Sequence, residues 1–160
     1  MKRLLFAAAL VVVSACGSES PTSPSQQSVV TPPRPVYPSL VGAWQGTETS
    51  SALGISAACN MSWIVTGQGD ANFFGTWQTS GANCGQAGQL AGTVSTNGAI
   101  SDLNLTATIA PSPCVRVAGT GLFSGVMSAN VVTAQASETI RCSQLPSDVT
   151  RSITLSMRRQ

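Results

Sequence analysis

The sequence contains no histidine, its one lysine is Lys2, and charged residues make up only 9% of the chain. Nucleophilic catalysis needs a base beside a serine or cysteine, and no histidine or later lysine is present to act as that base. Nucleic-acid binding needs a basic patch or stripe, which eight basic residues against six acidic ones do not form. These absences argue against a histidine-dependent hydrolase and against a nucleic-acid partner.

The acidic residues form no recognisable catalytic pair. Those after residue 40 are Glu48, Asp70, Asp102, Glu138 and Asp148. Asp70 and Asp148 fall in or beside predicted turns, where aspartate is usually structural, whereas Glu48 and Asp102 fall on predicted polar faces. Glu138 is predicted to form an exposed pair of little energetic value with Arg116. Because no motif brings two carboxylates together as a glycosidase requires, we predict no enzymatic activity and no cofactor.

The N-terminus has the pattern of an export signal. A positive start, Met1-Lys2-Arg3, precedes an uninterrupted apolar run from Leu4 to Val13, and the small residues Ser14-Ala15 follow. This order is typical of a secretory signal. The run is shorter than the ~20 apolar residues of a membrane-spanning helix. The alternatives are an ordinary signal peptide cut after Ala15 and a buried helix.

The four residues Val13-Ser14-Ala15-Cys16 resemble the lipobox of bacterial lipoproteins. The resemblance implies that residues 1–15 are removed and that the Cys16 thiol takes a diacylglyceryl group while the freed amine is acylated. Two or more acyl chains hold a protein stably in a bilayer. Gly17, where some enterobacterial lipoproteins carry Asp, implies sorting to the outer membrane. We therefore expect a lipid-anchored protein of the bacterial envelope, facing the periplasm or the cell surface.

Residues 16–39 are predicted to be a tether that begins with the lipidated cysteine. Six prolines lie between residues 17 and 39, together with several serines, and such segments stay extended or disordered. At ~3.1 Å per extended residue the tether reaches tens of ångströms. The alternative is a proline-rich partner motif around Thr31–Pro35. The folded domain is predicted to cover residues 40–160.

Alternation of polar and apolar residues dominates this domain, and no convincing helical period occurs after residue 40. Thr, Val, Ser and Gly are abundant, which suits strands and turns. Eight strands are predicted: residues 41–49, 57–66, 70–79, 86–95, 99–109, 114–126, 130–142 and 150–159. Short connections favour an antiparallel meander, and glycines inside the strands indicate bends where a sheet coils. We therefore predict closure into a small all-β barrel.

Two hairpins can be drawn from their turns. The loop Gly67-Gln68-Gly69 pairs Trp63 with Phe73, a register that hides the apolar side chains on one face. The dipeptide Asn97-Gly98 is a strong signal for a type I′ turn. Both hairpins join strands that are consecutive in the chain, as a meander requires.

The odd number of cysteines, five in all, is explained if lipidation uses Cys16. The even set that remains in an exported protein is expected to form two disulfides, and its members are Cys59, Cys84, Cys114 and Cys142. No CxxC motif or Cys/His cluster occurs, so we predict no metal site.

Strand register selects one of the three connectivities that four cysteines allow. A turn centred on Ser128, between the sixth and seventh predicted strands, places Cys114 opposite Cys142. A directly opposed non-hydrogen-bonded pair has Cα atoms ~4.5 Å apart, which a disulfide can bridge. Cys59 and Cys84 then form the second bond.

The two ends of the domain carry a recognisable pair of motifs. Gly42-Ala43-Trp44 opens the first strand and Arg158-Arg159 closes the last. This arrangement resembles the calycins, the lipocalins and avidins, in which a Gly-x-Trp packs near an arginine of the last strand. The resemblance implies an eight-stranded antiparallel up-and-down barrel in which Trp44 meets Arg159. The chain departs from lipocalins in having no C-terminal helix, and from avidins in having no recognisable biotin site.

Two functional hypotheses follow. The first is a binding module for a small apolar ligand, since an eight-stranded barrel can hold packed side chains or one small ligand. Its predicted pocket residues, which are equally core positions, are Trp44, Trp63, Phe73, Trp77, Leu103, Leu105 and Phe123. The second is a structural or interaction lipoprotein with a filled barrel, for which Phe74 is a candidate contact on the outer face. A continuous apolar cavity would favour the first, and an exposed apolar patch the second.

Overall fold

The computed structural model describes residues 32–109 and 114–160. The predicted signal, Cys16 and most of the tether lie outside the described residues. All strands among the described residues belong to the unit Arg34–Gln160. The strands are β1 (Gly42–Ala52), β2 (Ile55–Gly69), β3 (Asn72–Ser80), β4 (Ala87–Val94), β5 (Ala99–Ile109), β6 (Cys114–Ala118), β7 (Phe123–Ser128), β8 (Val131–Cys142) and β9 (Val149–Arg159).

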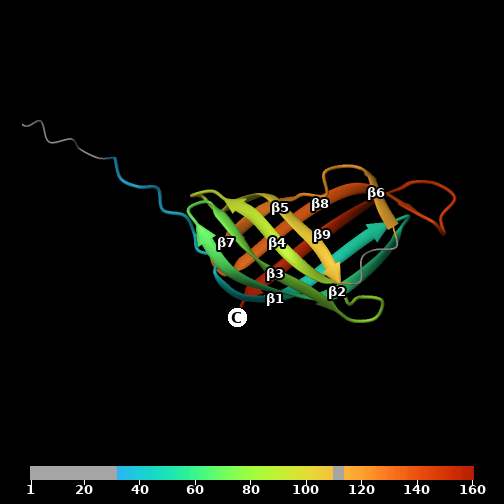
Figure 1. Ribbon diagram of the computed structural model, residues 1–160, viewed down its shortest axis with the longest axis horizontal. Helices are drawn as coiled ribbons and strands as arrows, with labels where there is room; N and C mark the ends of the chain where they lie inside the picture. Colours follow the sequence, from blue (N-terminus) through green and yellow to red (C-terminus); the bar gives the residue numbers. More distant parts are fainter. Residues whose placement is uncertain (1–31, 110–113) are drawn as a thin grey trace, which may run out of the picture. The chain divides into compact units, whose positions relative to one another are not determined.

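The strands form one antiparallel sheet that closes on itself. The order along the sheet is β6-β8-β7-β5-β4-β3-β2-β1-β9, and β8 also pairs with β9. Eight strands therefore make a closed barrel, and the short β6 is a ninth strand paired with β8 (Figure 1). The predicted eight-stranded up-and-down barrel is confirmed.

The sixth predicted strand, residues 114–126, is interrupted. β6 and β7 lie one after the other along the same edge of β8, because β9 occupies the other edge. Gly119 and Gly121 both have positive φ in the four-residue break between them. That conformation is accessible to glycine and costly for most other residues, so the chain can leave the strand at this break and rejoin it.

One end of the barrel is closed by the segment that enters β1. Trp44 Nε1 donates a hydrogen bond to the Leu40 carbonyl at 2.7 Å, and Leu40 N donates to Gln68 Oε1 at 2.8 Å. The guanidinium of Arg159 lies 4.8 Å from the centroid of the Trp44 ring and donates to the Ser39 carbonyl. The Trp44–Arg159 contact implied by the calycin resemblance is therefore present. We call residues 34–41 the strap and this end of the barrel the strap end.

In the hairpin of β2 and β3, the predicted side chains face the interior, but the two strands pair in a different register. Trp63 pairs with Trp77, not with Phe73. The chain turns at Asp70-Ala71 instead of at residues 67–69, and a β-bulge in β2 absorbs one extra residue. Asp70 adopts a positive φ of 52°, which a tight turn requires and which aspartate tolerates better than most residues. The predicted and observed partners of Trp63 differ by an even number of residues, so the same side chains face the interior.

Glycines let neighbouring strands approach closely as the sheet coils. A Cβ atom on Gly46 of β1 would lie 1.8 Å from the carbonyl oxygen of Ser156 in β9. A Cβ on Gly75 of β3 would lie 2.1 Å from the Ile64 carbonyl oxygen in β2. Both contacts are with backbone, which cannot swing aside. Strand glycines therefore mark tight coiling, as the sequence predicts.

The substitution Gly46→Ala should separate β1 from β9 and lower the free energy of unfolding by about 1–3 kcal/mol, the usual cost of overpacking. Urea unfolding followed by tryptophan fluorescence measures this loss. Gly69→Ala is the matched control, since nothing lies within 4 Å of the Cβ position there. Equal unfolding midpoints for the two variants would contradict the close approach of β1 and β9.

Candidate functional site

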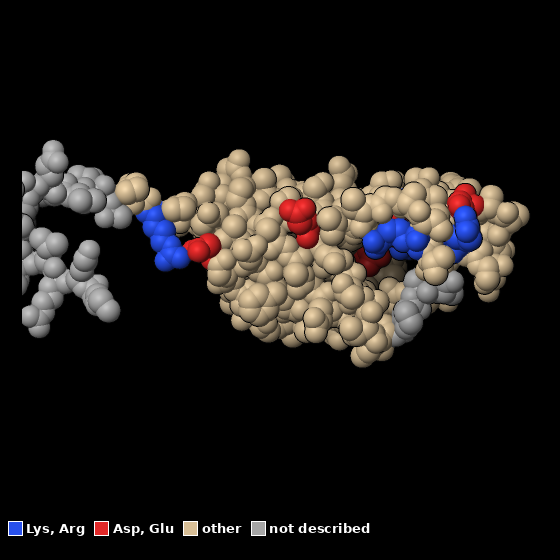
Figure 2. All heavy atoms as spheres, turned by 45° about the horizontal axis from the view of Figure 1, so that its top comes forward, with Lys and Arg blue, Asp and Glu red and all other residues tan. Residues whose placement is uncertain are grey.

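The interior of the barrel is hollow at the end away from the strap. A cavity of about 420 Å³ lies there. Seven of the nine strands contribute to its wall, and Figure 2 shows a hollow with acidic atoms recessed inside it and basic side chains beside it. The lining residues are Glu48, Trp77, Gln86, Asn104, Leu105, Thr106, Ala107, Cys114, Arg116, Gly121, Phe123, Glu138, Ile140, Arg151 and Ile153.

The cavity lies against a break in the hydrogen-bonded wall. β5 pairs with β7 at Ala99, Ile100 and Leu103, and β6 pairs with β8. The part of β5 from residue 104 onward therefore has no pairing with β6 among the described strands. Side chains of both segments line the cavity. The two described segments therefore face the same cavity without a strand ladder between them.

A buried glutamate joins two arginines inside the cavity. Glu138 of β8 is 5% exposed. Its Oε2 accepts a hydrogen bond from Arg116 Nε at 2.6 Å, and its Oε1 accepts one from Arg151 Nε at 2.7 Å. Arg116 also donates to the Thr120 carbonyl at 2.8 Å. The predicted Arg116–Glu138 pair is therefore present. Its predicted exposure is wrong for Glu138, which shares the inward phase of Ala134 and Ala136 on β8.

The environment of Glu138 favours its charged form. Burial raises the pKa of the Glu138 carboxyl, but the hydrogen bonds and charges of Arg116 and Arg151 outweigh burial and hold this pKa below its usual value. A buried carboxylate bound on both oxygens is the arrangement in which a charge is tolerated inside a protein. Glu138 therefore links β6, β8 and β9 as an ion-pair network.

Glu48 is the second carboxyl group of the cavity and lies in a different environment. It is half-buried on β1 and makes no hydrogen bond or ion pair with another described residue. Burial raises its pKa, the positive charge of Arg151 opposes this rise, and the negative charge of Glu138 adds to it. The net effect is a raised pKa. The prediction that Glu48 lies on a polar outer face is wrong, since it shares the inward phase of Trp44.

The predicted pocket residues separate into two groups. Trp77, Leu105 and Phe123 line the cavity. The other four are fully buried in the packed core that continues toward the strap end, and they are Trp44, Trp63, Phe73 and Leu103. The barrel is thus packed in one half and hollow in the other. The charged lining residues missed by sequence reasoning could have been found from strand phase, since Arg151 shares the inward phase of the buried Ile153 and Leu155.

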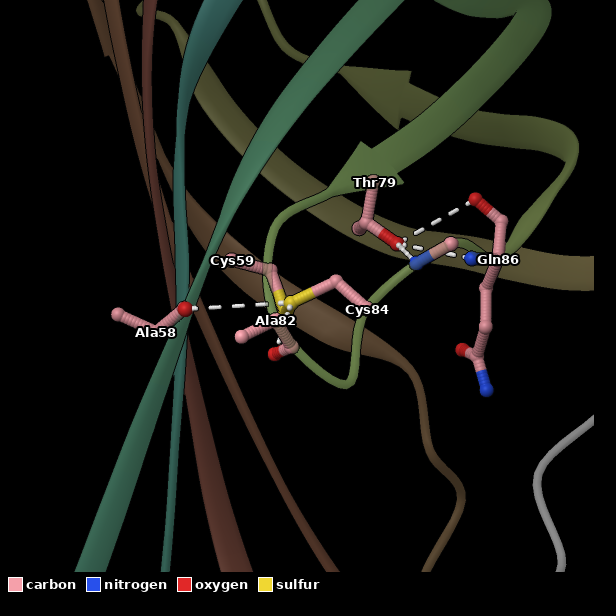
Figure 3. Close-up of a disulfide and its surroundings, with 7 residues drawn as sticks. Ala58, Cys59, Thr79, Ala82, Cys84 and Gln86 are labelled. Carbon is pink, nitrogen blue, oxygen red and sulfur yellow. Dashed lines mark hydrogen bonds between the residues drawn. A yellow bond between two sulfur atoms is a disulfide. The ribbon is translucent and has the colours of Figure 1, made fainter.

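Two disulfides stabilise the cavity end. Cys59 of β2 is bonded to Cys84, with Cα atoms 5.9 Å apart, and Cys114 of β6 is bonded to Cys142 of β8, with Cα atoms 4.2 Å apart. Figure 3 shows the loop that carries Cys84 folded back against β2. Both predicted bonds are therefore present in the predicted pairing.

The loop that carries Cys84 also positions a residue of the cavity wall. Thr79 N donates to the Gln86 carbonyl at 2.8 Å. Thr79 Oγ1 accepts a hydrogen bond from Gln86 N at 3.1 Å and donates one to the Gln86 carbonyl at 3.3 Å (Figure 3). Gln86 lies on the cavity wall. These hydrogen bonds fix the end of β3 to the start of β4, and the disulfide fixes the loop between them to β2.

The second disulfide forms although the predicted turn is wrong. β7 and β8 turn at Ala129-Asn130, beyond Ser128, so the register at this turn differs from the predicted one by three residues. The break between β6 and β7 and a bulge between Arg116 and Ala118 offset this shift in register. Cys114 and Cys142 therefore still face each other.

The described residues contain no group of three or more potential metal ligands. Within residues 32–109 and 114–160 there is likewise no helix long and apolar enough to cross a membrane.

No family model and no curated protein matches this chain. Among solved structures, EF1p2_mFAP2b bound to DFHBI is similar with a TM-score of 0.54 and 16% identity, covering 76% of this chain and 94% of that one. An S-type phycobiliprotein lyase, CPES from Guillardia theta, is similar with a TM-score of 0.40 and 11% identity, covering 76% and 88%. The likeness to EF1p2_mFAP2b shows a shared fold. Together with the closed eight-stranded barrel, it defines a calycin-like fold.

The environment of Glu48 predicts an unusual effect of pH on stability. A raised pKa means that the folded state holds the Glu48 proton more tightly than the unfolded state, so stability falls as pH rises from the ordinary value of 4.5 through the raised value. Glu48→Gln removes this loss. We expect the variant to melt at a higher temperature than the wild type near neutral pH, with the difference shrinking as the pH falls below the ordinary pKa.

Thermal melting across a pH series, monitored by circular dichroism, measures this difference. Asp102→Asn removes one acidic charge at an exposed position of β5 and serves as the control. A lower melting temperature for Glu48→Gln at neutral pH would show that the fold stabilises the carboxylate, which is incompatible with a raised Glu48 pKa.

Proposed function

We propose that this protein is a small-ligand binding module and that the cavity at the end away from the strap is its site. The observation that carries the proposal is the uneven filling of one closed barrel, with large side chains packed in one half and about 420 Å³ of space in the other. Ligand pockets commonly have volumes of roughly 300–1,000 Å³. The similar barrel of EF1p2_mFAP2b is bound to DFHBI, which supports a small molecule as the kind of partner.

The chemistry of the wall favours an amphipathic ligand over a purely apolar one. Trp77, Leu105 and Phe123 offer apolar surface for a ligand body. Glu48 lies in the same wall and offers charge for a polar group of the ligand. Pockets that combine apolar walls with a few polar groups orient their ligands through those groups.

A binding role is favoured over catalysis by the state of the two carboxyl groups. Glu138 is engaged on both oxygens by arginines, which leaves Glu48 as the carboxyl group open to a ligand. General acid–base chemistry on a glycoside needs two such groups. We therefore propose a protein that holds its ligand without transforming it.

The interaction hypothesis is supported less well. Phe74 is 57% exposed on the outer face, as that hypothesis requires. However, a Cβ on Gly67 would lie 2.3 Å from the Phe74 ring, so the ring already covers the backbone of a bulged glycine. Cross-strand packing of an aromatic over a glycine stabilises a sheet edge or bulge without any partner. The exposure of Phe74 therefore has a sufficient structural cause.

Filling the cavity should abolish ligand binding. Ala107 lines the cavity on β5, and Ala107→Phe places a ring where the ligand body would lie. Fluorescence titration with dansylamide, a neutral probe that brightens in apolar surroundings, is expected to show binding to the wild type and none to this variant. Ala99→Phe, at an exposed position of the same strand, is the control and should bind as the wild type does. Equal binding by Ala107→Phe would place the probe elsewhere and contradict the proposed site.

We also propose that Cys16 carries the lipid that anchors this module in the bacterial envelope. Support comes from the charged start, the short apolar run and the Val13-Ser14-Ala15-Cys16 motif. The proline-rich segment before the strap would then separate the barrel from the lipid headgroups. The outer membrane is the expected location, because Gly17 follows the cysteine.

Replacing the lipidated cysteine should release the protein from the membrane. Cys16→Ser, expressed in a bacterial host, is expected to move the protein from the membrane fraction to the soluble periplasmic fraction and to remove the mass of the acyl chains. Ser18→Ala is the control and should stay in the membrane. A wild-type protein found in the soluble fraction with Cys16 unmodified would identify an ordinary secretory signal instead.

A further inference from the structure

We infer that the ligand of this cavity carries a protonated nitrogen on an apolar body, an organic amine or amidine, and that Glu48 is its counter-ion. This inference rests on the proposed function and gives the chemical class of the ligand. It follows from the hydrogen-bond partners of the four charged side chains in the cavity wall.

Three of these four side chains satisfy one another. Arg116 and Arg151 each donate to a different oxygen of Glu138, at 2.6 and 2.7 Å, and Arg116 donates also to a backbone carbonyl. Glu48 alone makes no hydrogen bond or ion pair with a described residue. A half-buried carboxylate without such a partner is energetically costly, so a ligand that donates to it gains more than one that does not. The strongest donors to a carboxylate are positively charged nitrogen groups.

An anionic ligand fits the same wall less well. The two guanidinium groups already share the charge of Glu138, so an added anion would have to compete with that carboxylate for them. It would also lie in the same small cavity as the negative charge of Glu48. Like charges in a partly desolvated site repel strongly. The arrangement therefore selects a cation and opposes an anion of the same shape.

The apolar part of the wall suits the same class of ligand. Trp77 and Phe123 line the cavity together with Glu48. Aromatic faces attract organic cations, and tryptophan attracts them most strongly. A cation on an apolar body can therefore contact the aromatic rings and the carboxylate within one pocket.

The protonation of Glu48 should make cation binding depend on pH, which the binding of a neutral apolar ligand would not. The groups facing it in the cavity are Arg151, Arg116 and Glu138, and burial raises the Glu48 pKa despite the nearby arginine. A bound cation favours the ionised carboxylate, so binding releases a proton wherever the empty site holds one. The affinity for a cation should therefore rise with pH as Glu48 ionises. The affinity for a neutral probe should stay nearly constant.

Three matched probes test the inference on the full chain carrying Cys16→Ser, exported to the periplasm so that the disulfides form. They are dansylcadaverine, which ends in a primary ammonium group, dansyl-6-aminohexanoate, which ends in a carboxylate, and neutral dansylamide. We expect the ammonium probe to bind about tenfold or more tightly than the carboxylate probe, the effect of one charge-assisted hydrogen bond. Glu48→Gln should lower the affinity for the ammonium probe by about the same factor. It should change the affinity for dansylamide by less than twofold. Asp102→Asn, on the exposed face of β5, should change neither.

The outcomes separate this inference from the proposed function. If no probe binds the wild type, both are overturned. If dansylamide binds but the ammonium probe has no advantage over the carboxylate probe, or keeps its affinity in Glu48→Gln, the cavity binds ligands and the inference about their charge is wrong. The pH series on the wild type needs no variant, and a constant affinity for the ammonium probe from acidic to neutral pH would also overturn the role of Glu48.

Discussion

The pairing of β8 with β9 is the contact on which the rest of this structure depends. It runs from Val131 opposite Arg158 to Ile140 opposite Val149 and joins the two ends of the sheet, because β9 also pairs with β1. Once the sheet is closed, each strand has one face inside and one outside. Gly46 permits this closure, since β9 passes too close to β1 there for any side chain. The identity of each inward residue then decides whether the interior is filled.

The two halves of the interior are held together by different interactions. Near the strap, large aromatic and aliphatic side chains fill the space, and the Trp44–Arg159 contact covers the end. At the other end the described strands β5 and β6 are not paired, and the Cys114–Cys142 disulfide and Glu138 fix β6 to β8. Glu138 connects β6 to β9 through the two arginines. Removing one partner from a buried pair of this kind is strongly destabilising, so the network has a structural role.

The fold could be predicted from the sequence because its determinants are local. Alternating residues and turn dipeptides indicate strands, and Gly42-Ala43-Trp44 indicates where the first one begins. The disulfide pairing is confirmed although the turn that predicts it is wrong, because a bulge and a broken strand restore the register at Cys114 and Cys142. The Trp63 register fails because the bulge in β2 leaves no clear mark in the sequence. The faces of that hairpin are nevertheless correct, since a shift by an even number of residues leaves each side chain on its side of the sheet.

The candidate site was harder to predict because a charged residue ordinarily indicates an outer face. That rule holds for an isolated strand and fails in a barrel with a hollow half, where inward positions can reach water through the cavity. Glu138 shows why an inward charge can be kept for stability, since it is fully bound by its neighbours. Glu48 makes no comparable hydrogen bonds with described residues that would stabilise the fold. Its raised pKa means that the ionised form is disfavoured at this position. Side chains that lower the stability of the fold are expected at positions where function requires them. For a carboxylate in a cavity wall, a bound cation is the group that would offset this loss of stability.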